Sequence, residues 1–412
     1  MKRKRSLPRW LGVALRPGRR RRVVVFVLLV ALGLLVSHCM GWTRQPVAAE
    51  TTILRVLLGP VTKTLVIEAE RLRCAEVAGL DGCTGIEVRT QSKGLLLLPL
   101  GGGAGRAVVV DGGRVEVAWQ GPARLSFADA PVAKSEREHF GRLVISADNT
   151  EDGDSKLRVV LHCDLEVYIS GVVAAEMGAS FPPAALAAQA IAARGFALTA
   201  RARRSALDFD VFDDERDQVY RGVDQDPRLI EAVRATSGQV LAYQDRLLRS
   251  YYASTCGGAT RDGHAFFKDV PREPMRGVRC DGCRDAPLFR WRRRIPLAAF
   301  VERGCSKTGR LGFDLRRDAS SGDLLAVVVS SAAKTLTISA KDLHRMRPLP
   351  SLWIDAMVLT SEGIEVRGRG FGHRVGLCQY GARGYAKAGW SHTTILEHYF
   401  PGARLLHLSD LD

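Results

Sequence analysis

Two stretches near the amino terminus are defined by what they lack. Residues 1–22 contain no Asp or Glu against ten Lys and Arg, and residues 23–43 contain no charged side chain. An uncharged run of this length can cross a bilayer, which needs about 20 residues. A positively charged flank stays on the cytoplasmic side. We therefore expect a basic cytoplasmic segment at 1–22 and a transmembrane signal-anchor at 23–43.

A cleaved signal peptide is the alternative for this stretch, because Val47-Ala48-Ala49 resembles a small-residue cleavage site. That site lies well beyond the apolar run, which ends near Val36. In either case the protein is exported. We expect it at the cell membrane with its main domain outside the cytoplasm, or secreted if cleavage occurs.

Further absences narrow the function. The sequence has no RNP-type motif, no basic helix followed by heptads and no paired zinc-finger pattern, which argues against nucleic acid as a partner. It also lacks an HExxH motif, the usual mark of a zinc hydrolase. The net charge is +16, but residues 1–22 carry +10 of it. The mild remaining charge suits an anionic polymer or a membrane-adjacent protein.

The chain is long enough for a large globular unit with an accessory region. Residues 53–148 read as short strands rich in β-branched and apolar residues, separated by glycines. Helical patterns follow from residue 165. The sequence predicts an α+β protein, in which a mixed β-rich core with packed helices is preceded by a β-rich accessory region at 44–139 and by the anchor.

One carboxylate stands where helical spacing calls for an apolar side chain. Glu176 falls on one helical stripe with Leu165, Ile169, Val172 and Val173. A carboxyl group on an apolar face loses hydration, which raises its pKa and suits it to general acid catalysis. The alternative is a glutamate at a frayed helix end, facing solvent.

A second helix is expected to begin near Ser180 and Pro182-Pro183, with the serine as a candidate N-cap. Its alanine-rich stripe indicates close packing against a neighbour. Arg194 interrupts the apolar run and could pair with a carboxylate, bind an anionic substrate group or reach the surface. Gly195 in mid-helix indicates a close approach of another segment.

The nine cysteines leave several pairings open. Cys74 and Cys83 are the expected simple disulfide, since export permits disulfides. Cys280-x-x-Cys283 has the spacing of zinc ligands, with Cys256 as a third candidate and Cys378 as a fourth. His264 is the alternative fourth ligand. Structural zinc, disulfides and free thiols all stay open for this group, and no cofactor is expected to be required for catalysis.

Six segments in order resemble the sporulation stage II protein D / amidase-enhancer LytB family (SpoIID/LytB) of bacterial cell-wall proteins. They are YISGVVAAEM, FPPAALAAQAIAARGFAL, DQVYRGV, STCGGAT, GRGFGHRVGLCQYGA and ILEHYFPGA. The resemblance covers about residues 140–405 and implies a catalytic domain there.

The resemblance implies a lytic transglycosylase that cuts peptidoglycan glycan strands whose stem peptides have been removed. The glutamate of the GVVxxEM motif is Glu176, which would act as the single general acid/base and leave a 1,6-anhydro-muramyl end. Residues in the other motifs are then expected to bind substrate or support the glutamate: Arg194, Gln218, Tyr220, Thr255, His373 and Gln379.

The chain departs from the family pattern at two places. Gly195 stands where the family usually has threonine, and Arg374 stands where it usually has a second glycine. The first could loosen the site and the second could place a cation beside it. The family also contains an alternative function, that of a non-catalytic wall-binding protein that enhances an N-acetylmuramoyl-L-alanine amidase, so such an amidase is a possible partner.

Overall fold

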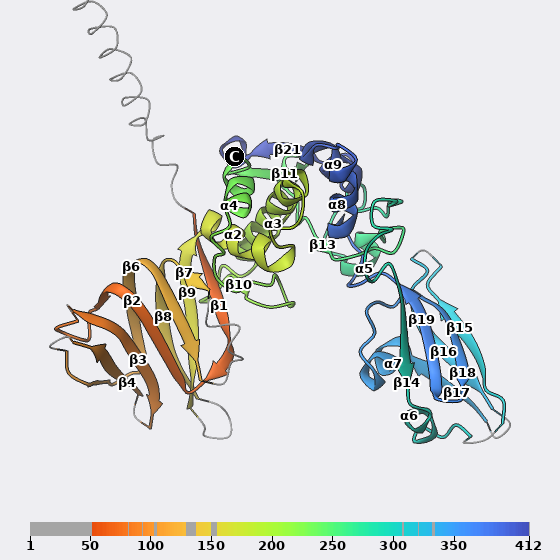
Figure 1. Cartoon of the computed structure of the whole chain (residues 1–412), viewed down its shortest axis with the longest axis horizontal. Coiled ribbons are helices and arrows are strands. Elements are labelled where there is room, and N and C mark those ends of the chain that lie inside the picture. Colours follow the sequence, from red (N-terminus) through yellow and green to blue (C-terminus); the bar gives the residue numbers. More distant parts are fainter. Residues whose placement is uncertain are drawn as a thin grey trace, which may run out of the picture. The chain divides into compact units, whose positions relative to one another are not determined.

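The computed structural model describes most of the chain after residue 51 (Figure 1). The described residues are 52–80, 82–92, 94–102, 105–128, 137–149, 155–306, 309–319, 321–331 and 334–411. The predicted segments 1–22 and 23–43 lie outside them. Within the described ranges, no helix is both long and apolar enough to cross a membrane.

A mostly antiparallel sheet, ten-stranded within the described residues, is formed largely by residues 53–164. Alternate side chains such as Leu65 and Ile67 are fully buried, because successive residues of a strand point to opposite faces. The strand order is β10-β1-β9-β8-β6-β2-β3-β4-β5, with β7 paired to β6. The strands are β1 (Ile53–Thr62), β2 (Thr64–Cys74), β3 (Cys83–Gln91), β4 (Gly94–Gly101), β5 (Val108–Val110), β6 (Arg114–Phe127), β7 (Glu138–His139), β8 (Arg142–Asn149), β9 (Ser155–Asp164) and β10 (Val211–Phe212).

The strand-rich character predicted for this region is confirmed, with two differences in detail. Strand β6, RVEVAWQGPARLSF, has 14 residues and is longer than the short strands predicted. The sheet also continues past residue 139, because β8 pairs with β6 and β9 pairs with β1. The accessory strands and the first strands of the expected 140–405 domain therefore share one sheet.

The expected disulfide between Cys74 and Cys83 is absent, and both side chains are buried free thiols. The Cys74 thiol donates to Glu76 at 3.0 Å. Cys74 pairs with Val117 of β6, whereas Cys83 pairs with Gly101 of β4. The prediction was wrong because the two cysteines have different strand neighbours.

Helix α2 (Leu165–Glu176) follows β9 directly and carries the predicted stripe. Asp164 is its N-cap, and its carboxylate accepts from the backbone N–H of Glu166 at 2.7 Å. The helix ends at Glu176, and Gly178 then takes a left-handed φ of 73°. This turn leads the chain into the next helix.

Helix α3 (Pro183–Arg203) confirms the second predicted helix, but Ser180 is not its cap. Pro182 occupies the N-cap position without a side-chain hydrogen bond, and Pro183 begins the helix. Its predicted alanine stripe is buried, from Leu186 to Ala197. Helix α3 packs against α2, α4 (Pro227–Arg234), α8 (Gln379–Lys387) and α9 (His392–Tyr399).

Short strands bring distant motifs together beside these helices. β13 (Tyr252–Ala253) runs parallel to β20 (Leu377–Cys378), and β20 leads straight into α8. This pairing places the STCGG loop against the glycine-rich stretch near residue 373. The neighbouring elements are β11 (Gln239–Tyr243), β12 (Arg246–Leu247), α5 (Gly263–Phe267), β21 (Arg404–His407) and the 3-10 helix η2 (Leu408–Asp410).

Residues 290–369 have a hydrophobic core of their own, which sequence analysis did not predict. It is formed by side chains such as Trp291, Phe300, Val327 and Ile364. The elements are β14 (Arg290–Ile295), α6 (Leu297–Val301), β15 (Gly312–Arg317), β16 (Leu324–Ser330), β17 (Thr335–Ser339), α7 (Ala340–Met346), β18 (Ile354–Thr360) and β19 (Gly363–Arg369). The α+β class is thus confirmed, while the anchor lies outside the described residues.

Candidate functional site

Glu176 is the last residue of α2, and its side chain is only partly exposed. Its stripe partners Leu165, Ile169, Val172 and Val173 are all buried. The predicted position of a carboxyl group at the edge of an apolar face is therefore confirmed. A fully solvated glutamate at a frayed helix end is ruled out, because defined groups surround the carboxyl.

Three neutral donors from three distant segments point at this carboxyl group. The backbone N–H of Val219 donates to Oε1 at 3.0 Å, and the Tyr252 hydroxyl donates to the same oxygen at 3.5 Å. The side-chain amide of Gln379 donates to Oε2 at 3.2 Å. The carboxyl is therefore held in one orientation by contacts that only the folded chain can supply.

Burial raises the pKa of Glu176 above the usual value for a glutamate. The hydrogen bonds from Val219, Gln379 and Tyr252 stabilise the carboxylate and act in the opposite direction, but burial has the larger effect. A carboxyl group whose pKa is raised in this way can act as a general acid, and the same donors stabilise its anion once the proton has left.

Gln218 supports this arrangement from behind. It is 1% exposed, accepts from the Tyr168 hydroxyl at 3.3 Å and donates to the Tyr252 hydroxyl oxygen at 2.9 Å. Because Tyr252 accepts from Gln218, its own proton is free to point at Glu176. Of the two roles expected for Gln218, its burial and its contact with Tyr252 favour support of the glutamate. Gln379, 3% exposed, has the same supporting character.

Tyr220 and Thr255 also lie too deep to be substrate contacts. Each is 1% exposed. Tyr220 stacks on Tyr168 behind α2, with ring centroids 5.2 Å apart. Thr255 exchanges backbone hydrogen bonds with Phe371, which joins the STCGG loop to the glycine-rich stretch. The predicted substrate roles of these two residues are corrected to packing and loop support.

Arg194 is likewise structural. Its side chain is completely buried and makes two hydrogen bonds to the Glu166 carboxylate, at 2.8 and 2.7 Å. A third bond reaches the carbonyl oxygen of Gln239 at 2.8 Å. Of the roles that the sequence left open, pairing with a carboxylate is the one that the fold uses, since the buried guanidinium binds Glu166.

His373 is the predicted binding residue that reaches open space. It is partly exposed and lines two cavities, of about 220 and 560 Å³, that also share Phe266. The smaller cavity is also lined by Tyr252, the residue whose hydroxyl contacts Glu176. Burial lowers the pKa of His373 to about 4, which makes the ring neutral at pH 7.

The two departures from the family pattern have clear structural settings. A Cβ atom on Gly195 would lie 2.5 Å from the Ser250 hydroxyl oxygen, so the predicted close approach is confirmed. Arg374 has a left-handed φ of 63°, which explains a preference for glycine at this position. Its guanidinium pairs with Asp323 at 2.5 Å and stacks on Trp353, and Arg374 lines the larger cavity together with His373.

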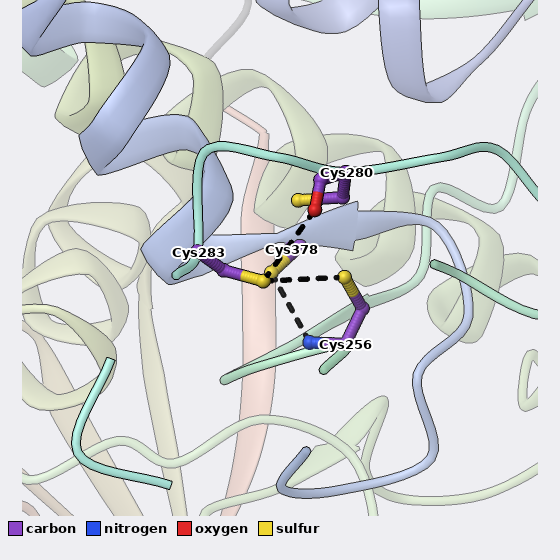
Figure 2. A group of neighbouring side chains, drawn as sticks. All are labelled: Cys256, Cys280, Cys283 and Cys378. Carbon is purple, nitrogen blue, oxygen red and sulfur yellow. Dashed lines mark hydrogen bonds between the residues drawn. The ribbon is translucent and has the colours of Figure 1, made fainter. Parts of the chain in front are cut away.

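The structure brings together the four cysteines proposed as metal ligands (Figure 2). The sulfur atoms of Cys256, Cys280, Cys283 and Cys378 all lie within 4.8 Å of one another, and all four residues are buried. His264, the alternative fourth ligand, is outside the group. Its Nδ1 lies 2.7 Å from the carbonyl oxygen of Val270.

Sequence reasoning missed three contributors to the site. Val219 acts through its backbone N–H, which no side-chain pattern can reveal. Tyr252 has a tyrosine neighbour, and only the register of β13 decides which of the two faces Glu176. Phe266, 42% exposed beside His373, is an apolar surface that its short helix α5 presents.

Glu176 is thus a partly buried carboxyl group that three neutral donors orient on an α+β scaffold. Residues 153–243 match the family described as Stage II sporulation protein (SpoIID). The chain is similar to this family over the matched residues, which include α2, α3 and Glu176.

Three further proteins are similar to the chain over more than half of its length. The chain is 28% identical over 262 residues to stage II sporulation protein D of Bacillus subtilis, covering 58% of this chain and 74% of that protein. It is 27% identical over 278 residues to an uncharacterized protein of Brachyspira hyodysenteriae, covering 65% and 72%. It is 26% identical over 291 residues to the amidase enhancer of Bacillus subtilis, covering 58% and 40%.

Proposed function

We propose that this protein is a lytic transglycosylase that cleaves peptidoglycan glycan strands, with Glu176 as its single acid and base. The observation that carries the proposal is the Glu176 carboxyl group itself. It is partly accessible, its pKa is raised by burial, and Val219, Tyr252 and Gln379 hold it in place.

The reaction needs this carboxyl group in both protonation states. Protonated Glu176 gives its proton to the glycosidic oxygen as the bond from that oxygen to muramyl C1 breaks. The resulting carboxylate takes the proton of the muramyl C6 hydroxyl as O6 bonds to C1. The ring is left as a 1,6-anhydro end, Glu176 is again protonated, and no water is consumed.

The environment of Glu176 suits a mechanism with one carboxyl group. Ordinary glycosidases use two carboxyl groups, the second acting as a nucleophile or activating water. In the described part of the chain, burial and hydrogen bonds from neutral groups account for the pKa of Glu176, with no contribution from another charge. The C6 hydroxyl of the substrate would take the place of the second group.

Two cavities, the smaller of them lined by Tyr252, would supply a place for the glycan strand. Both are lined by Phe266 and His373. The exposed ring of Phe266 can pack against the apolar face of a sugar. Neutral His373 can hydrogen-bond to hydroxyl or acetamido groups without adding charge.

The identity of the products tests this proposal. The full-length chain, purified in detergent, is incubated with peptide-stripped glycan strands in water enriched in oxygen-18, and the fragments are analysed by mass spectrometry. We expect 1,6-anhydro-muramyl ends without the heavy isotope. Reducing ends that carry oxygen-18 at the new terminus would show hydrolysis and contradict the proposal.

A second function is favoured by one comparison, the similarity to a protein named amidase enhancer. The chain would then bind the wall and stimulate a separate N-acetylmuramoyl-L-alanine amidase without cutting glycan strands. In that case a Glu176→Gln variant should stimulate amidase as well as the natural chain does, while neither yields anhydro ends. Loss of anhydro product in the variant alone would exclude it as the sole function.

We also propose that the protein works outside the cytoplasm and is attached to the membrane through residues 23–43, whose uncharged sequence motivates this placement. Protease added to intact spheroplasts should digest the main domain and leave a membrane-bound amino-terminal fragment. Full protection from the protease would contradict this placement.

A further inference from the structure

We propose that Cys256, Cys280, Cys283 and Cys378 bind one zinc ion, and that this ion positions Gln379 against Glu176. The ligands come from three segments that are far apart in sequence. Cys256 belongs to the STCGG loop, Cys280 and Cys283 to a CDGC turn, and Cys378 to the end of β20 (Figure 2).

The sulfur spacing fits zinc. Tetrahedral zinc with Zn–S bonds of about 2.3 Å places its sulfur ligands about 3.8 Å apart. The sulfurs of Cys256 and Cys283 are 3.6 Å apart, and all four sulfurs lie within 4.8 Å of one another. Four cysteines that meet at this spacing also match the commonest donor set of structural zinc sites.

The surroundings of the sulfurs suit thiolates. The backbone N–H groups of Cys256 and Gly381 lie 3.2 and 3.3 Å from the sulfur of Cys378 and donate to it. Cys378 is also the N-cap of α8, where the partial positive charge of the helix favours an anion. The Tyr399 hydroxyl lies 3.0 Å from the sulfur of Cys280. Such donors orient metal-bound thiolates.

Glycines allow the segments to approach closely enough for the four sulfurs to meet. A Cβ atom on Gly381 would lie 2.6 Å from the sulfur of Cys280 and would clash with the Tyr399 hydroxyl. A Cβ atom on Gly282, inside the CDGC turn, would overlap the carbonyl oxygen of Gly381. The turn and the first residues of α8 are therefore in direct backbone contact.

The link to the acid–base site follows from chain order. Gln379 comes immediately after Cys378 and is the first residue of α8, and its amide donates to Glu176 at 3.2 Å. A metal bound to the sulfur of Cys378 would hold the first turn of α8 in place, and with it the backbone from which the Gln379 side chain extends. Zinc is thus a structural ion. It would position Glu176 through Gln379, the residue that follows the ligand Cys378 in the chain.

The metal content of the full-length chain tests the site directly, without any activity assay. We expect about one zinc per chain by mass spectrometry of the metal, as four thiolates and one ion require. Cys283→Ala and Cys378→Ala should each lower this content at least about fivefold. Cys163→Ala is the matched control, because Cys163 is buried but lies outside the group, and it should keep the full content.

Cobalt replacement keeps the proposal testable if the variants fail to fold. The natural chain loaded with Co²⁺ should show the visible bands of a tetrahedral ion and the near-ultraviolet charge-transfer bands of thiolate ligands. The intact mass should correspond to reduced cysteines once the metal is removed. A metal-free chain with four reactive thiols, or with disulfides at these positions, would overturn the proposal.

The positioning role rests on the proposed function and has a separate test. Loss of the Gln379 hydrogen bond raises the pKa of Glu176, so the alkaline limb of the activity profile should move to higher pH in Gln379→Ala. Cys378→Ala should move it in the same direction, and the double variant should move no further than Gln379→Ala alone. If the alkaline limb of the activity profile did not move in a zinc-free chain, the positioning role would be contradicted. If the natural chain had no activity at all, the proposed transglycosylase function would be contradicted, but the measured zinc content would still test the metal site.

Discussion

Two opposing effects set the pKa of Glu176, and substitutions can separate them. Burial favours the protonated form, and the donors Val219, Tyr252 and Gln379 favour the anion. Sequence alone could identify the carboxyl group, since it interrupts an apolar stripe. Sequence could not give its partners, because Gln379 is 203 positions away along the chain.

Substitution of Gln379 should change the pH dependence in a defined direction. Gln379 lowers the pKa of Glu176, so Gln379→Ala should raise this pKa and move the loss of general-acid activity to higher pH. A hydrogen bond to a charged group contributes about 1.5–3 kcal/mol, which corresponds to about one to two pH units. The measurement is the pH profile of kcat/KM.

The matched control for this experiment is Gln225→Ala. The amide of Gln225 also donates to a carboxylate, that of Glu138, at 2.9 Å, but on an exposed part of the chain. This variant should leave the profile unchanged. A shift of the Gln379→Ala profile to lower pH would contradict the role assigned to Gln379.

The buried pair of Arg194 and Glu166 should affect stability and leave substrate affinity alone. Glu166→Ala leaves the fully buried guanidinium of Arg194 without its carboxylate partner. Leaving a buried donor without its partner costs about 1–3 kcal/mol of the free energy of unfolding, and the larger cost of a fully buried ion pair does not apply because Glu166 is 30% exposed. Denaturant unfolding measures this loss, and KM for glycan strands should not change.

An exposed pair provides the comparison. Glu231 and Arg234 on α4 are both mostly solvent-exposed and 2.8 Å apart. Glu231→Ala should change the free energy of unfolding far less than Glu166→Ala, because solvent screens an exposed pair. If Glu166→Ala and Glu231→Ala lowered the free energy of unfolding equally, the burial of Arg194 would not make its ion pair more important for stability than an exposed pair.

Among the elements, the helices were the most predictable and the short strands the least. Periodicity and the prolines near residue 182 predicted α2 and α3, although Ser180 proved not to cap the second helix. The parallel pairing of β13 with β20 was not predictable, because it joins residues more than 120 positions apart through two-residue strands. That pairing nevertheless assembles both Tyr252 and Cys378 into the site.

The close approach of α3 to residues 248–250 should make Gly195 intolerant of a side chain. Alanine in place of glycine favours a helix by about 1 kcal/mol, yet its Cβ would lie 2.5 Å from Ser250 Oγ and 2.9 Å from the Leu248 carbonyl oxygen. Overpacking of this kind costs about 1–3 kcal/mol, so we expect Gly195→Ala to lower the thermal unfolding temperature. Increased stability would contradict the close approach.

Gly312→Ala is the control. Its added Cβ would lie 3.8 Å from the Cβ atom of Ser330, which is an ordinary contact distance. The family's threonine should be even less tolerated at position 195. In this chain Gly195 therefore does not loosen the site but permits α3 to pack.

At the scale of the whole molecule, composition predicted the α+β class but not how the chain divides. Strands from both sides of residue 139 form one sheet, and residues 290–369 enclose a separate core. These outcomes depend on strand pairing between remote segments, which local patterns do not encode. The apolar strands themselves were visible because β-branched residues cluster between glycines.

Buried histidine should make the folded chain sensitive to acid. Burial lowers the pKa of His139 to about 4, whereas the unfolded chain has a pKa near 6.5. The unfolded state therefore binds more protons between these values, and stability is lost as pH falls from about 6.5 to about 4. The loss attributable to this residue is at most about 3 kcal/mol.

Chemical denaturation at a series of pH values measures this effect. A His139→Asn variant should have lower stability at pH 7 but a smaller decline between pH 6.5 and 4. A decline as steep as that of the natural chain would mean that His139 is not the group responsible.

The most direct test of the account compares Glu176→Gln with the natural full-length chain on peptide-stripped glycan strands. Removing a general acid and base lowers a rate by about 10²–10⁴-fold. We predict a loss of anhydro-muramyl product in this range, with folding retained and with full activity in the exposed control Glu397→Gln. Equal rates of product formation by Glu176→Gln and the natural chain would contradict the assignment of Glu176.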